Sequence, residues 1–241
     1  MLLKNQPIMK NYLVIGASSG IGKELASMLN HDGHQVYGTY RNTEVESKEN
    51  GVQYHYLDVT AEQPDLDFLP EILDGVAYCP GTITLRPFAR IKPEDFVKDY
   101  HIQVLGAVKV IQALLPRLKN SEAASVVMFS TVAVQTGFNF HSLVSASKGA
   151  VEGLARALAA EFAPKIRVNC IAPSITDTPL ASGLLNSDAK REANAQRHPM
   201  KKVGAVSDIA EMAAFLLSGK SGWITGQVMK VDGGMSSLRV G

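Results

Sequence analysis

A glycine-rich turn between an apolar stretch and an amphipathic stretch constrains this chain most. The apolar run Tyr12–Ile15 is typical of a buried parallel strand. The turn Gly16–Gly22 follows it, and apolar residues then recur at helical spacing as far as Leu29. Such glycines let the backbone approach a pyrophosphate, whose charge the free N–H groups of the helix N-terminus can bind. The turn therefore predicts a dinucleotide site, with a plain surface loop as the alternative.

Apolar runs and helical patterns alternate along the whole chain, which predicts parallel strands joined by helices. The expected strands are 12–15, 35–40, 52–57, 75–79, 125–130, 167–171 and 227–231, and the expected helices are 21–31, 92–118, 142–162 and 207–217. The predicted fold class is α/β, a Rossmann-type doubly wound parallel sheet of about seven strands with helices on both faces. We expect one domain, 1–241, in which the weakly patterned segment 174–200 is a substrate lid.

Composition excludes several classes of protein. The chain has 24 basic and 23 acidic residues with no basic block, so nucleic acid and membrane surfaces are not expected as partners. Cys79 and Cys170 fall in predicted strands and are expected to be small core residues, with no disulfide or metal-ligand spacing. The leader Met1–Lys10 lacks a signal-peptide core, Met9 could be an alternative start, and no run could span a bilayer. These features predict a cytoplasmic protein without a metal.

The end of the second predicted strand, Gly38–Asn42, determines the expected cofactor. NAD sites usually carry an acidic residue about 20 positions after the glycines. No acid occurs here, and Arg41 offers a guanidinium that can pair with a 2′-phosphate, assisted by Ser18. The sequence predicts NADP(H) in preference to NAD(H), unless Arg41 is simply a solvated loop residue.

Further motifs, in order along nearly the whole chain, resemble the short-chain dehydrogenase/reductase family. Ser145–Lys148 resembles the end of its Tyr-x-x-x-Lys motif, Val168–Pro173 the strand before its lid, and Ile224–Gly234 its C-terminal signature. The resemblance implies an NAD(P)-dependent oxidoreductase that acts on a small molecule. It implies that Asp58 holds the adenine edge, unless it is a turn residue, and that Thr178 holds the nicotinamide carboxamide. The cofactor-binding residues predicted in this way are Gly16, Ser18, Ser19, Gly20, Ile21, Gly22, Arg41, Asp58, Lys148 and Thr178.

The departures from the family pattern are equally informative. Lys148 places the family's tyrosine position at Val144, its serine position at Thr131 and its asparagine position at Gln103. Thr131 keeps a hydroxyl and Gln103 keeps an amide, but valine cannot transfer a proton at any pH. The resemblance therefore implies a catalytic set of Thr131, Lys148 and Gln103 with weakened activity, unless the register is misaligned.

Three functions remain open on the sequence. They are an NADP(H)-dependent oxidoreductase with a rebuilt proton path, a catalytically silent relative that acts as a sensor or scaffold, and an enzyme of another class such as a lyase. His141 is a candidate replacement proton donor, or else a solvent-facing loop residue. The residues expected to form an apolar substrate pocket, or alternatively part of the core, are Phe138, Phe140, Leu143 and Val144.

The predicted helix 142–162 also suggests self-association. Between 151 and 162 its charged residues are Glu152, Arg156 and Glu161, so most of its circumference is apolar. A helix that is apolar nearly all round is buried, and one face remains after the other packs on the sheet. The family resemblance implies pairing of these helices, so we expect a homotetramer or homodimer.

Overall fold

The computed structural model describes residues 9–43, 45–46 and 48–239. Most of the leader Met1–Lys10, on which the absence of a signal peptide was predicted, therefore lies outside the described residues. Within them, no helix combines the length and the hydropathy needed to cross a membrane.

One sheet forms the centre of the molecule, with strand order β3-β4-β2-β1-β5-β6-β7-β8. Every neighbouring pair is parallel except β3 with β4, so the predicted Rossmann-type parallel sheet is confirmed and a two-residue antiparallel edge strand is added to it. The strands are β1 (Asn11–Ile15), β2 (Gln35–Tyr40), β3 (Lys48–Glu49), β4 (Val52–Tyr56), β5 (Gly75–Tyr78), β6 (Ala124–Phe129), β7 (Ile166–Pro173) and β8 (Val228–Val231).

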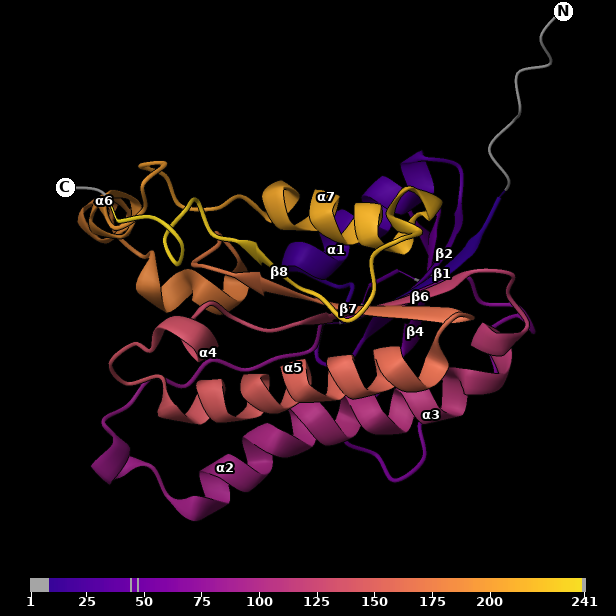
Figure 1. Ribbon diagram of the computed structural model, residues 1–241, viewed down its shortest axis with the longest axis horizontal. Coiled ribbons are helices and arrows are strands. Elements are labelled where there is room, and N and C mark those ends of the chain that lie inside the picture. Colours follow the sequence, from indigo (N-terminus) through magenta and orange to yellow (C-terminus); the bar gives the residue numbers. More distant parts are fainter. Residues whose placement is uncertain (1–8, 44, 47, 240–241) are drawn as a thin grey trace, which may run out of the picture.

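Helices cover both faces of this sheet (Figure 1). One face packs against α1 (Gly20–His31) and α7 (Val206–Leu217), and the other against α3 (Gly106–Lys119) and α5 (Ser142–Phe162). The shorter helices are α2 (Pro93–Tyr100), α4 (Ala133–Thr136) and α6 (Asp188–Gln196), and short 3₁₀ helices occur at η1 (Phe88–Arg90), η3 (Pro179–Leu184) and η4 (Gly219–Ser221).

The helix expected at 92–118 is interrupted. A π-helical turn, His101–Leu105, separates α2 from α3, and the hydroxyl of Tyr78 donates to the carbonyl of Ile102 inside this turn. A π turn widens the helix and re-aims the side chains within it, often near functional sites. The turn carries Gln103, so its position could not follow from regular helical spacing.

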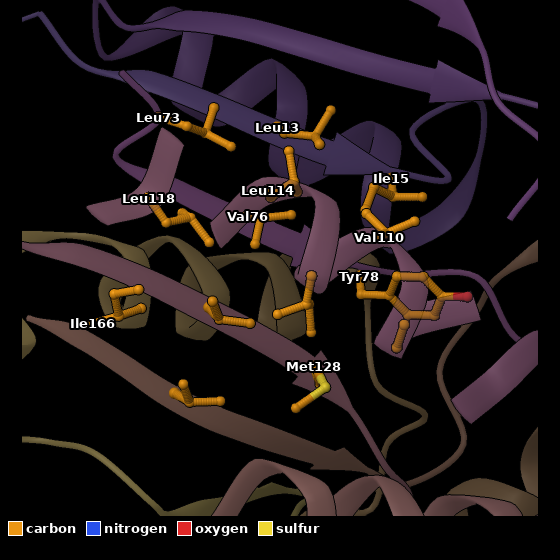
Figure 2. Packing of buried hydrophobic residues seen from close by; sticks show 14 of the residues in the cluster. Leu13, Ile15, Leu73, Val76, Tyr78, Val110, Leu114, Leu118, Met128 and Ile166 are labelled. Atoms are coloured by element: carbon orange, nitrogen blue, oxygen red, sulfur yellow. The ribbon is translucent and has the colours of Figure 1, made fainter. Parts of the chain in front are cut away.

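Alternation along the strands explains the two hydrophobic layers. In β1, Tyr12 and Val14 belong to the core under α1 and α7, whereas Leu13 and Ile15 belong to the core under α3 and α5. Figure 2 shows Val110, Leu114 and Leu118 of α3 packed over the strand residues of this second layer. A parallel sheet buried on both faces needs such continuous apolar strands, and this was the pattern visible in the sequence.

The turn between β1 and α1 is closed by a direct backbone contact. Gly16 has φ +77°, and a Cβ added to Gly22 would collide with the carbonyl oxygen of Gly16 and lie 3.0 Å from its carbonyl carbon. A side chain at position 22 would force α1 away from the end of β1. Glycine at position 22 is therefore required by packing.

We expect Gly22→Ala to lower the free energy of unfolding by about 1–3 kcal/mol, because the added methyl meets backbone that cannot move aside. Gly219→Ala is the matched control, since a Cβ there meets nothing within 4 Å. Urea unfolding of both variants measures the difference, and equal midpoints would contradict the packing requirement.

Candidate active site

A cavity of about 690 Å³ opens at the carboxyl ends of the parallel strands, where ligands bind in open α/β sheets. The glycine turn, the residues after β5 and β6, and the segment after β7 all contribute to its lining. Among the described residues that line it there is no Asp or Glu, whereas Arg41, Lys148 and Arg197 contribute cationic groups. The cavity therefore suits an anionic ligand.

The predicted phosphate-binding turn lies along this cavity. All six of its predicted residues line the wall: Gly16, Ser18, Ser19, Gly20, Ile21 and Gly22. Ser19 is the N-cap of α1, and its side chain makes no capping hydrogen bond. The first N–H groups of α1 are thus free of a side-chain cap and can bind a phosphate. The cradle fits the dinucleotide expected from the sequence.

Arg41 and Asp58 meet at the far end of the cavity, beside the ends of β2 and β4. Arg41 Nη2 lies 3.3 Å from Asp58 Oδ2, and the Arg41 side chain is 44% exposed. The backbone and hydroxyl of Thr60 donate to Asp58 Oδ1, and these bonds, helped by Arg41, lower the pKa of the Asp58 carboxyl. Arg41 lines the cavity and Asp58 does not. Asp58 is placed to orient the guanidinium, and its Thr60 bonds are those of a turn.

Thr131, Val144 and Lys148 line the inner part of the same cavity. Thr131 follows β6, and its hydroxyl accepts a hydrogen bond from the backbone of Ala133 at 3.3 Å. Val144 and Lys148 lie one turn apart on α5, so the ammonium sits beside the position where the family has its tyrosine. The structure thus brings a hydroxyl and an ammonium together around an apolar side chain.

Gln103 lies behind this wall and does not line the cavity itself. Its Nε2 donates to Asp99 Oδ2 at 2.7 Å, and Thr82 Oγ1 donates to the other oxygen of that carboxylate. Because the carboxylate only accepts, the Gln103 Oε1 must face away from it, and this buried atom has no hydrogen-bond partner among the residues that the structure describes. A Cβ added at Gly81 would lie 3.5 Å from both Gln103 Oε1 and Lys148 Nζ. The amide oxygen therefore faces the region of the ammonium.

Burial governs the chemistry of Lys148. Desolvation lowers the pKa of its ammonium to about 8, an effect that nearby Cys170, Asp99 and Cys79 oppose. The carboxylate of Asp99 thus helps to keep a cation in a site that disfavours one. Lys148 remains mostly charged near neutral pH and can donate to hydroxyl groups placed in the cavity.

Thr178 connects the segment after β7 to the glycine turn. Its hydroxyl accepts from Ala181 N at 3.3 Å and so caps η3, while its Cβ lies 3.5 Å from a Cβ added at Gly20.

The predicted lid segment 174–200 contains η3 and α6. The ion pair of Arg191 with Asp177 joins α6 to the start of this segment. The segment is ordered and borders the cavity.

Several other sequence expectations are only partly matched. Phe138 and Val144 line the cavity, but Leu143 is buried away from it and Phe140 is 55% exposed. Cys79 was expected in the core; β5 ends one residue earlier, so Cys79 is only partly buried and lines the cavity. Burial raises the pKa of its thiol to about 12, so it is not a thiolate nucleophile.

His141 and Glu152 also differ from what their sequence positions suggested. His141 lines the cavity, but its Nδ1 is bonded to the carbonyl of Asn139 and its ring packs edge-on against Phe138. Glu152, one of the three charged residues noted in this helix, is buried and accepts from Ser130 Oγ at 2.8 Å. Because Glu152 is tied to the end of β6, it steadies the segment that carries Thr131.

Polar residues that the sequence analysis did not single out also surround the site. They are Thr82, Asp99, Ser174 and His198. Asp99 carried one usable signal, since it lies four residues before Gln103 on the same predicted helix and therefore on the same face. Ser174 and His198 are joined only by the fold and gave no such signal.

Comparison with known proteins agrees with this geometry. Residues 16–236 match the family model described as enoyl-(acyl carrier protein) reductase. A tropinone reductase homolog of Arabidopsis thaliana is 30% identical over 94% of this chain and 92% of its own length. The 3-oxoacyl-[acyl-carrier-protein] reductase of Thermotoga maritima is 29% identical over 92% of this chain and 96% of its own length.

Solved structures show the same fold. ElxO with NADP bound superposes with a TM-score of 0.86 at 28% identity, covering 96% of this chain and 100% of that one. A short-chain type dehydrogenase/reductase from Mycobacterium ulcerans gives 0.83 at 28% identity, covering 95% and 90%. With its glycine turn, its Thr131–Lys148 wall and a match over nearly its full length, this chain belongs to the short-chain dehydrogenase/reductase family.

Proposed function

We propose that this protein is an NADP(H)-dependent oxidoreductase of weakened activity that acts on a carbonyl or hydroxyl group of a small, apolar molecule. The observation that carries the proposal is the meeting of Thr131 and Lys148 with the phosphate-binding turn in one cavity. When bound there, the nicotinamide would exchange a hydride with the substrate. We further propose a cytoplasmic location, on the basis of the unpaired cysteines.

The roles of the individual residues follow from their positions. The turn Gly16–Gly22 would hold the pyrophosphate. Arg41, which Asp58 orients, would bind the 2′-phosphate. Lys148 would bind the nicotinamide ribose, and Thr178 would bind the carboxamide. Gln103 would lie behind Lys148. The Thr131 hydroxyl would donate to the substrate oxygen, which Val144 cannot protonate.

A catalytically silent relative is the second candidate, and Val144 is the observation that favours it. Such a protein would bind the same cofactor and signal or scaffold without hydride transfer. Tight NADPH binding with no turnover over a broad panel of carbonyl compounds would identify it.

We expect tighter binding of NADPH than of NADH, because only NADPH presents a phosphate to Arg41. Arg41→Ala should weaken NADPH binding by about tenfold or more and leave NADH binding nearly unchanged. Isothermal titration measures both affinities, with the exposed Arg90→Ala as the control. Equal affinities in the wild type, or an Arg41→Ala variant that binds NADPH normally, would refute the preference.

Val144→Tyr should restore a proton donor beside Lys148 and raise carbonyl reduction by about tenfold or more, since general acids contribute 10²–10⁴-fold. Val144→Phe places the same ring without the hydroxyl and is the matched control. NADPH oxidation is followed at 340 nm with both variants. A gain shared by the phenylalanine variant would assign the effect to pocket shape rather than to proton transfer.

We also propose that the protein is a homotetramer or homodimer that pairs along α5. Between Val151 and Phe162, the exposed positions of this helix are Gly153, Arg156, Ala157, Ala160 and Glu161. The small residues among them allow close approach of a second helix. Because Glu152 is buried and Arg156 pairs with it, this face carries less free charge than the sequence suggested.

Light scattering at micromolar concentration should therefore give a mass of two or four chains. Ala157→Glu should lower that mass by placing a carboxylate on the paired face, whereas Ala157→Ser should not. A monomer mass for the wild type would contradict the proposed pairing.

A further inference from the structure

A serine and a histidine outside the predicted catalytic set form a hydrogen-bonded pair on the wall of the same cavity. Ser174 directly follows β7, and His198 lies just after α6. His198 Nε2 lies 2.8 Å from Ser174 Oγ, and His198 Nδ1 lies 2.8 Å from the carbonyl oxygen of Asn194. The His198 residue is only 3% exposed, so its ring is held at both nitrogens.

The partner of Nδ1 determines the direction of these bonds. A carbonyl oxygen only accepts, so Nδ1 carries a hydrogen and Nε2 of the neutral ring is an acceptor. The Ser174 hydroxyl then donates to Nε2 rather than to Met235 Sδ at 3.1 Å, because a thioether is a weak acceptor. In the charged ring Nε2 donates instead, which frees the serine hydrogen for a group in the cavity. The site accommodates both protonation states.

The charged groups around His198 have partners of their own. Those on the surrounding segments are Arg197, Lys201, Asp177, Arg191 and Asp232. The two carboxylates are engaged, Asp177 by the Arg191 guanidinium and Asp232 by Ser236 and the backbone of Gly234. Arg197 lies over the ring of Phe138, and Lys201 donates to the carbonyl of Gln196. No carboxylate among the described residues hydrogen-bonds to His198, and the ring nitrogens contact Ser174 Oγ and the carbonyl oxygen of Asn194.

The pair is close to the predicted catalytic wall. The backbone N–H of Val132, next to Thr131, donates to the carbonyl of Pro173, next to Ser174, at 3.1 Å. Thr131 and Ser174 therefore sit on adjacent segments of the same cavity edge. Val144 lines the cavity from α5, so a substrate oxygen that contacts Thr131 has a valine, and no acid, at the family's tyrosine position.

We infer that Ser174 and His198 supply the proton that the family's tyrosine would otherwise give, an inference that rests on the proposed carbonyl reduction. A bound reduced nicotinamide would supply the hydride for the new C–H bond, and the carbonyl π electrons would become a lone pair on oxygen. The Ser174 O–H breaks as the substrate O–H forms, and His198 Nε2–H passes its proton to Ser174. The neutral imidazole then takes a proton from water, which restores the pair.

Activity measurements on five variants test the pair. His198→Gln and Ser174→Ala should each lower kcat for a panel of aliphatic and aromatic ketones by about tenfold or more, with NADPH affinity unchanged. The exposed His31→Gln, at the far end of α1, is the matched control and should match the wild type. In Val144→Tyr, which has its own acid, adding His198→Gln should change kcat by less than about twofold.

The pH profile separates His198 from Lys148. Wild-type kcat should fall as pH rises, because proton transfer needs the charged imidazole. In His198→Gln the remaining decline should follow Lys148, whose pKa is about 8. An unchanged profile would overturn the inference.

Imidazole NMR of the protein without cofactor gives a readout that does not depend on turnover. Neutral His198 should show the Nδ1–H tautomer, and Ser174→Ala should change the Nε2 chemical shift, because the hydroxyl that donates to Nε2 is lost. An Nε2–H tautomer would overturn the inference whatever the activity. Equal losses from His198→Gln in the wild type and in the Val144→Tyr variant would reduce His198 to a structural role.

Failure of the proposed function has a different signature. If the wild type binds NADPH but reduces no ketone in the panel, the oxidoreductase proposal is wrong and the donor is refuted with it. If the wild type turns over and His198→Gln does so equally well, carbonyl reduction stands and only the donor is wrong.

Discussion

The contact between Gly22 and the carbonyl of Gly16 is the constraint on which the rest of the site depends. It seats the first turn of α1 directly against the end of β1, so the uncapped N–H groups of the helix point along the cavity wall. The same seating brings Gly20 against Thr178, which positions the start of the segment after β7. One close backbone approach thereby aligns the glycine turn with the segment after β7.

A second constraint is the buried ammonium of Lys148. Burial disfavours the charged form, and Asp99 offsets part of that cost through a carboxylate fixed by Thr82 and Gln103. Because Asp99 accepts from the Gln103 amide nitrogen, the amide oxygen is turned toward the lysine. Glutamine is one methylene longer than the asparagine of the family, and a π turn carries it. The carboxylate of Asp99, one helical turn earlier, nevertheless directs the amide oxygen of Gln103 toward the lysine.

The fold could be predicted because its signals are local. Continuous apolar strands, the glycine turn and helical periodicity each lie within a short window, and the structure confirms the sheet they indicated. Which side chains reach the cavity, and which lie behind its lining, could not be predicted in the same way. The π turn moved Gln103 behind the wall, and the early end of β5 brought Cys79 into it. Ser174 and His198 meet only because the chain after α6 returns to the end of β7, which no spacing in the sequence records.

The two halves of the site are built with different supports. The half next to the glycine turn is formed by strand ends and α1, and backbone hydrogen bonds of the sheet hold the strand ends in place. The proposed proton-donating half depends on how α6 sits, because Asn194 orients the His198 ring from the last turn of that helix. α6 is held by the Arg191–Asp177 pair, which is half exposed and open to screening by salt. The proposed Ser174–His198 donor therefore depends on the position of the segment that borders the cavity. A tyrosine on α5 would not depend on that segment.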